Sequence, residues 1–174
     1  CCSRCYDSVT GLKRMDPFKA IRPYQNHEVQ AILSRLINNP DLFTDIIFIV
    51  EGQPIHAHKA VLAAQCQQFH AMFSSGMRES TQTEIMIQGE WSHLAFLAML
   101  EFLYTGTGPD TAELALDLIG LADQFTLDGL KRLCENLLVH HVDVDNVCAL
   151  LSRAHKFNAT GLKKVCFSFM VKHW

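Results

Sequence analysis

The chain has 174 residues and is 49% hydrophobic, which is enough for one domain with a sizeable core, or for one domain with an extension. Its 15 basic and 18 acidic residues give a net charge of −3 and form no basic stripe, so nucleic-acid binding is not expected. No apolar run reaches the length of about 18 residues that a membrane-spanning helix needs, so no membrane partner is expected.

Residues 1–25 carry Cys1, Cys2 and Cys5, which belong to a total of seven cysteines. Cys2 and Cys5 have the spacing of half a zinc site, but no second pair of ligands follows nearby. The other cysteines lie mostly inside apolar patterns, which is typical of reduced thiols in an intracellular protein, cytoplasmic or nuclear. We therefore expect residues 1–25 to be a tail or linker without a metal site. Because the chain starts without Met or a signal-peptide pattern, we expect it to be a fragment of a longer protein.

A helix is predicted over residues 26–38, because apolar residues recur there at i, i+3, i+4, i+7 and i+8. Asn26 is a candidate N-cap, and Pro40 disfavours helical geometry at the residue before it. An apolar stripe of this width has to be covered, either by the core of the chain itself or by a partner. The stripe consists of Val29, Ile32, Leu33, Leu36 and Ile37.

A β-hairpin is predicted next. Residues 45–50 (DIIFIV) are β-branched and aromatic, as in a buried strand, and residues 55–58 form a shorter second strand. Residues 51–54 contain Gly and Pro, which favour a turn. From Lys59 the apolar period becomes helical, so two short helices are expected up to Phe73.

The rest of the chain is expected to be helical, apart from a polar loop at residues 76–83 and a short strand at residues 84–87. Most helix starts carry a capping residue, and Asn158 suits the left-handed position that follows a helix end. These elements predict an α+β fold with a helical hairpin at its end. The predicted helix starts are Ser92, Ala112, Asp128, Asp145 and Thr160.

Several of these elements, in this order, resemble the signature of the BTB (POZ) domain. The resemblance is carried by I-x-A-H-K-x-V-L-A-A at residues 55–64 and F-x-x-M-F at residues 69–73, and F-L-Y-T-G at residues 102–106 fits further along. It covers roughly residues 41–140, so we assign 26–140 to this domain with its N-terminal helix. The family resemblance implies that a helical cluster flanks a small mixed sheet. Ile55 replaces the usual Phe, and Cys66-Gln67 replaces the common Ser-Pro. Both are packing or capping changes that leave the fold intact. Residues 141–174 are expected to form a pair of helices, which resembles the start of a BACK-type extension.

The resemblance implies a homodimer. In long-form BTB domains, a helix like that at residues 26–38 packs across a two-fold axis onto a second copy, so its apolar stripe becomes the dimer interface. Asp45 and Lys59 match a charged pair near that seam, and pairing would avoid the cost of burying an isolated charge. The alternatives are a helix that folds onto its own core and two independent surface charges.

The resemblance also implies a partner. Met77-Arg78-Glu79 matches the hydrophobic-x-Glu element of BTB domains that bind the N-terminal domain of a cullin, and Tyr104 matches a further cullin contact. The alternative for this short match is a solvated loop. The implied function is a substrate adaptor in a ubiquitin ligase, with substrate proteins bound through domains outside this fragment. The alternative function is a BTB oligomerisation module that binds no cullin and recruits a corepressor or other partners.

Catalytic patterns such as GxSxG, HExxH, GxGxxG or a P-loop do not occur in the sequence. His56 and His58 could offer two metal ligands, but no third ligand stands nearby in the sequence. We therefore expect neither an enzyme nor a cofactor.

Overall fold

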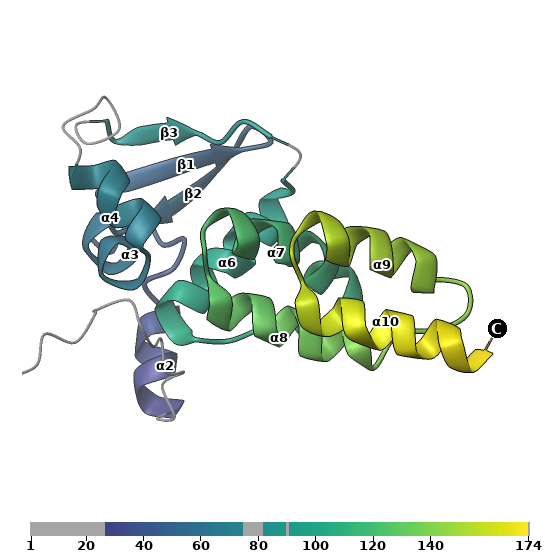
Figure 1. The fold of residues 1–174 in the computed structure, drawn as a ribbon. Coiled ribbons are helices and arrows are strands. Elements are labelled where there is room, and N and C mark those ends of the chain that lie inside the picture. Colours follow the sequence, from purple (N-terminus) through teal and green to yellow (C-terminus); the bar gives the residue numbers. More distant parts are fainter. Residues whose placement is uncertain (1–26, 75–81, 90, 174) are drawn as a thin grey trace, which may run out of the picture.

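The structure of the chain is a computed structural model, which describes residues 27–74, 82–89 and 91–173. A small sheet lies at one end of the molecule, and helices α9 and α10 lie at the other end (Figure 1). No helix within the described ranges has the length and hydropathy that crossing a bilayer requires. The strands are β1 (Ile46–Val50), β2 (Gln53–Ala57) and β3 (Glu84–Met86). The helices are α2 (His27–Ser34), α3 (Lys59–Gln65), α4 (Gln67–Ser74), α6 (His93–Thr105), α7 (Ala112–Gln124), α8 (Asp128–Val139), α9 (Val147–Lys156) and α10 (Thr160–His173).

The sheet is mixed, as the family resemblance implies. Its strand order is β2-β1-β3, with β1 antiparallel to β2 and parallel to β3. The hairpin turn has only two residues, Glu51 and Gly52, whose φ angles of 52° and 76° are those of a type I′ turn. The turn is therefore shorter than predicted, and Pro54 lies inside β2 opposite Ile49. Because β2 is an edge strand, a residue without an N–H group is tolerated there.

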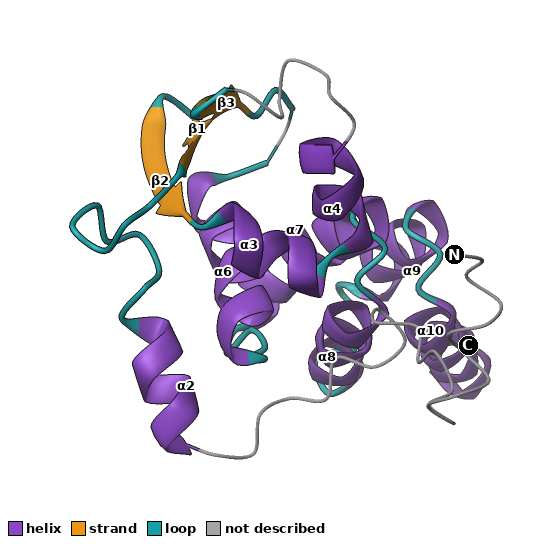
Figure 2. Ribbon diagram, turned by 90° about the vertical axis from the view of Figure 1, so that its left-hand side faces the viewer, coloured by secondary structure: helices purple, strands orange, loops and turns teal. Residues whose placement is uncertain are grey.

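One face of the sheet packs on the helices (Figure 2). Alternate residues of β1 are buried, as the period of two in a strand requires, and Phe48 is the largest of them. Its ring centroid lies 5.7 Å from that of Phe69 in α4 and 5.2 Å from that of Phe96 in α6. Phe69 in turn stacks on Phe125, with 5.0 Å between the centroids. This aromatic cluster joins the sheet to three helical segments, and tilted or offset ring pairs of this kind add stability beyond their buried area.

The first described helix is shorter than predicted, because α2 ends at Ser34 instead of Asn38. The next residues form tighter turns with i to i−3 hydrogen bonds, such as the one from Arg35 N–H to the Ile32 carbonyl at 3.2 Å. Asn38 then takes a φ of 50° and bonds to the edge of β2: its N–H donates to the His56 carbonyl at 3.0 Å, and its Oδ1 accepts from the His56 N–H at 3.2 Å. The contact with the sheet therefore ends the helix before Pro40 does.

Helix ends confirm some capping predictions and correct others. Ser92 caps α6, and Asn158 follows α9 with a φ of 52°. Asp128 is the first residue of α8 and not its cap, because Leu127 N–H bonds back to the Ala122 carbonyl and closes the end of α7 at that point.

A second correction concerns α9, which begins at Val147, two residues later than predicted. The carboxylate of Asp143 accepts hydrogen bonds from the N–H groups of Asp145 and Asn146 at 2.9 Å and 2.8 Å. This local turn holds Asp145 outside the helix.

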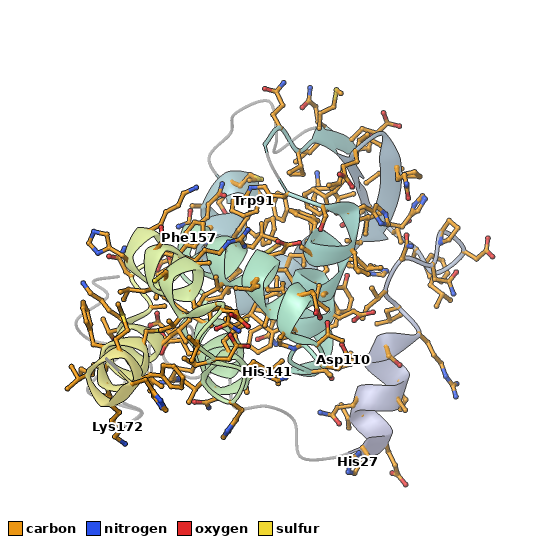
Figure 3. All side chains as sticks on the ribbon, turned by 90° about the vertical axis from the view of Figure 1, so that its right-hand side faces the viewer. His27, Trp91, Asp110, His141, Phe157 and Lys172 are labelled. Carbon is orange, nitrogen blue, oxygen red and sulfur yellow. The ribbon has the colours of Figure 1, made fainter. Side chains whose placement is uncertain are left out.

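Helix α10 packs against α8, and the residue that follows α9 closely approaches α7 at Gly120. A Cβ atom built on Gly120 would lie 2.7 Å from the ring of Trp91 and 3.0 Å from the ring of Phe157, so both aromatic rings occupy the place of its missing side chain (Figure 3). Phe157 is the C-cap residue of α9. Gly120 therefore sets how closely the C-terminal pair approaches α7.

We predict that Gly120→Ala destabilises the protein, although Ala favours an α-helix over Gly by about 1 kcal/mol. Overpacking of this kind costs about 1–3 kcal/mol before that gain. Urea unfolding followed by circular dichroism measures the change. Gly129→Ala is the matched control, because its added Cβ would meet only Phe102 at 3.2 Å. Equal or greater stability of Gly120→Ala would contradict the packing argument.

Candidate protein-interaction surface

The apolar stripe of α2 is divided between the core and the solvent. None of its residues is fully buried. Leu33, Leu36 and Ile37 pack partly against the core, whereas Ile32 leaves 59% of its surface exposed. The helix is held to the body by Gln30, whose Nε2 donates to the carbonyl of Thr105 at 3.0 Å. Part of the predicted stripe therefore stabilises the chain's own fold, and part remains available to a partner.

Phe43, which the sequence analysis did not single out, is the most exposed large hydrophobic residue described. Its side chain is 94% exposed, and its backbone has a φ of 57°. A bulky residue in the left-handed region is an outlier that costs backbone energy. Phe43 has no place in an apolar repeat, so no sequence pattern could reveal it. An exposed aromatic ring on a strained loop is an observation that leads to a binding hypothesis.

Asp45 and Lys59 contact one another, but in a different way from the predicted charged pair. The Asp45 carboxylate accepts a hydrogen bond of 2.7 Å from the backbone N–H of Lys59, at the first residue of α3. The Lys59 ammonium donates to the carbonyl of Gln82 at 3.0 Å and lies 5.7 Å from the centroid of the Phe73 ring. Asp45 is exposed, so its main contribution here is to complete the N-terminus of α3, where negative charge is favourable.

Glu51, for which the sequence predicts only a place in a turn, has the same role at α6. Its carboxylate accepts a hydrogen bond of 2.9 Å from the backbone N–H of His93, the first residue of α6. The two residues are 42 positions apart, so no local capping pattern could reveal this contact.

Tyr104, which the resemblance predicts as a cullin contact, is a core residue in the single chain. Its side chain is 1% exposed. Its hydroxyl accepts a hydrogen bond of 2.8 Å from the backbone N–H of His58 and lies 2.9 Å from Nδ1 of the same residue. Nε2 of His58 lies 2.6 Å from the carbonyl of Leu42. The sequence motif correctly marks Tyr104 as a special position, but the side chain points inward and fastens the loop before β1.

Burial raises the pKa of Tyr104 to about 12, and the hydrogen bond from the His58 backbone opposes part of that shift. The neutral hydroxyl can donate to Nδ1 of His58 while it accepts from the backbone N–H. Nε2 of His58 then carries the ring proton and donates to the carbonyl of Leu42. Every polar group in this series of contacts therefore has a hydrogen-bond partner.

The other predicted cullin contacts, Met77 and Glu79, lie outside the described residues. The described neighbours of that segment are the end of α4 at Ser74 and the residue Gln82, whose carbonyl binds Lys59. In the sequence, Met77 and Glu79 fall between α4 and β3, and their role stays a prediction.

A cleft of about 300 Å³ lies where α7, α8 and α9 meet. Its lining is mostly apolar and includes the charged residues Glu113 and Arg153. Among residues 27–74, 82–89 and 91–173, no three His, Cys, Asp or Glu side chains are grouped as a metal site would require. The exposed Ile32 and Phe43 side chains are the kind of feature found where one protein contacts another.

Comparison with known proteins points the same way. The family described as the BTB/POZ domain matches residues 35–142. Among solved structures, the BTB domain of zebrafish PATZ1 matches with a TM-score of 0.53 and 26% identity, and the match covers 64% of this chain and 88% of that chain.

Curated relatives include an Arabidopsis thaliana ARM repeat protein interacting with ABF2, which is 35% identical over 76% of this chain and 18% of its own length. TD and POZ domain-containing protein 2 of Mus musculus is 38% identical over 72% of this chain and 34% of its own length. The mouse TD and POZ domain-containing protein 1 is 36% identical over 86% of this chain and 42% of its own length. This chain therefore spans less than half the length of these relatives.

We predict that Tyr104→Phe lowers the free energy of unfolding by about 1–3 kcal/mol at neutral pH, because it leaves the buried N–H of His58 without an acceptor. The stability difference between wild type and variant should shrink from pH 10 to about 12. In that window the Tyr104 phenol ionises in the unfolded chain but not in the folded chain, which lowers the free energy of unfolding of the wild type. The variant has no phenol at this position, so its free energy of unfolding does not fall for this reason. Urea unfolding at several pH values measures it. A constant difference would show that Tyr104 is not held neutral by the fold.

Proposed function

Because this chain belongs to the BTB/POZ family of protein-interaction modules, we propose that it homodimerises and acts as an adaptor that binds a cullin. The observation that carries the proposal is the exposure of two large apolar residues, Ile32 and Phe43. These side chains are 59% and 94% exposed, on α2 and on the loop that joins it to β1. Large exposed apolar groups close together in the chain are typical of protein-interaction sites.

The dimer seam would use the outward part of α2, with Val29 beside Ile32, while Leu33, Leu36 and Ile37 support the helix from within. A second copy would then cover Phe43 and restrict its strained loop. Asp45 and Lys59 lie at the end of that loop and at the start of α3, at the same end of the β1–β2 hairpin. Stable homodimers commonly bury about 2,000 Å² or more, so Ile32 and Phe43 would be central anchors of a larger surface.

The cullin contact would be made by Met77 and Glu79. A Met side chain is flexible and fits irregular apolar pockets, and a Glu two residues later can accept charge-assisted hydrogen bonds from a partner. Tyr104 would contribute only from within, by fixing the fold on which this contact is displayed. Helices α9 and α10, as a partial BACK-like extension, would support the adaptor role.

The whole protein would bind substrates through parts of the longer chain that this sequence does not contain. The free cysteines among the described residues, Cys66, Cys134, Cys148 and Cys166, fit an intracellular setting, cytoplasmic or nuclear. The second candidate function is a BTB oligomerisation module that recruits a corepressor or another partner without a cullin. The exposure of Ile32 and Phe43 fits a dimer in both functions, so cullin binding is what separates them.

We expect the wild-type chain to be a dimer by light scattering at micromolar concentration. Ile32→Asp with Phe43→Ser should give a monomer with a nearly unchanged melting temperature, because both side chains are exposed in the single chain. Leu94→Asp is the control, since Leu94 is 62% exposed on α6. A wild type that is monomeric, or a double variant that stays dimeric, would refute this seam.

Met77→Ala with Glu79→Lys should weaken binding to a purified cullin N-terminal domain at least tenfold, or about 1.4 kcal/mol. The matched control is Arg78→Ala, which changes the residue between the two proposed contacts. Calorimetry gives the affinity, and light scattering confirms that the dimer is retained. A dimeric wild type that binds no cullin supports the oligomerisation-only function, and unchanged binding by the double variant shows that the contact lies elsewhere.

A further inference from the structure

The charges of the chain are segregated along its length. All 18 acidic residues precede residue 146, so the pair α9–α10 contains no carboxylate side chain. The part of the chain before that pair is therefore more negative than the whole chain, whose net charge is −3. The pair itself carries only bases among its charged residues. These are Arg153, Lys156, Lys163, Lys164 and Lys172.

Among the described residues, most of these positive charges form no ion pair. Arg153 is the exception: its guanidinium lies 3.5 Å from the Asp117 carboxylate and donates to the Leu116 carbonyl at 2.7 Å. Lys163 Nζ lies 3.3 Å from Nδ1 of His155, which adds no negative charge. Across the part of the chain that the structure describes, the two ion pairs are Arg153–Asp117 and Lys131–Asp123. The four lysines of α9 and α10 therefore have no carboxylate partner among the described residues.

On α10 the lysines flank a short apolar stripe. Phe167 and Val171 are one helical turn apart and are 49% and 83% exposed. With 3.6 residues per turn, Lys163 falls on one side of these two residues, and Lys164 and Lys172 fall on the other side. We call these five residues the lysine-flanked stripe.

We propose that the lysine-flanked stripe binds an acidic amphipathic helix of a partner protein. Phe167 and Val171 offer the i, i+4 contacts that the apolar side of such a helix would cover. Lysines on both sides would face acidic residues that flank the apolar side of the partner helix. This surface is separate from α2, the helix of the proposed dimer seam, because α10 lies at the other end of the molecule (Figure 1).

The arrangement favours a protein over other anionic partners. A helix that lies in a membrane surface needs a broad apolar face, but the opposite face of α10 is already packed, with Leu162 and Cys166 fully buried. Only two exposed apolar residues remain for insertion. A nucleic acid would also meet the excess of acids in the rest of the chain, which repels phosphate.

The test uses the full 174-residue chain and a labelled synthetic helix of about 18 residues, with Leu at i, i+4 spacing and Glu on both sides. Fluorescence anisotropy should show saturable binding that weakens as salt is raised. A peptide with Lys in place of Glu should not bind. We expect Lys164→Glu, and separately Phe167→Ser, to weaken binding by about fivefold or more. Lys156→Glu is the matched control, because it changes the net charge equally but lies on α9.

Absence of binding by the wild type would overturn the proposal. Equal weakening by Lys156→Glu and Lys164→Glu would also overturn it, because the contact would then be a general charge effect and not a site on α10. Tighter binding to vesicles with anionic lipid, or to single-stranded DNA, than to the acidic peptide would replace it with a lipid or nucleic-acid surface. Light scattering of each variant shows whether the dimer persists, so failure here is distinguishable from failure of the proposed adaptor function.

Discussion

The packing of Phe48 against helical aromatic rings is the interaction on which the rest of the structure depends. Phe48 is fully buried at the centre of β1, the middle strand of the sheet. Its contacts with Phe69 and Phe96 bring α4 and α6 under the sheet, and Phe125 extends the cluster to the end of α7. A three-stranded sheet has little stability without an apolar face to cover, so this cluster makes the sheet and the helices one folded unit.

Helix N-termini in this fold are completed by carboxylates from distant parts of the chain. Asp45 binds the first N–H group of α3, Glu51 binds the first N–H group of α6, and Glu135 binds the N–H of Gly161 in α10. Each contact satisfies a donor that the helix cannot satisfy itself and places negative charge at the positive end of the helix dipole. These acidic residues link segments that are distant in the sequence, so their charge stabilises the fold of the single chain.

Much of the fold could be predicted from the sequence because it depends on local periodicity. The alternation in β1 and the helical spacing from Lys59 onward are such local signals. The predicted end of the first helix is wrong because the hydrogen bond between Asn38 and His56 links two segments that are distant in the sequence. The burial of Tyr104 was missed for a related reason, since a motif match identifies a position without showing which way its side chain points. Phe43 carries no periodic signal at all, and only its exposure and backbone geometry distinguish it.

The contact between Asn38 and β2 also determines which edge of the sheet can grow. In the antiparallel register of β1 and β2, the outward backbone groups of β2 belong to Pro54 and His56. Pro54 has no N–H group, and both outward groups of His56 are already bonded to Asn38. An incoming strand would therefore find no free donor along β2. Exposed edges of this kind are the usual starting points of aggregation, so the turn after α2 protects the sheet against unwanted strand addition even in a single chain.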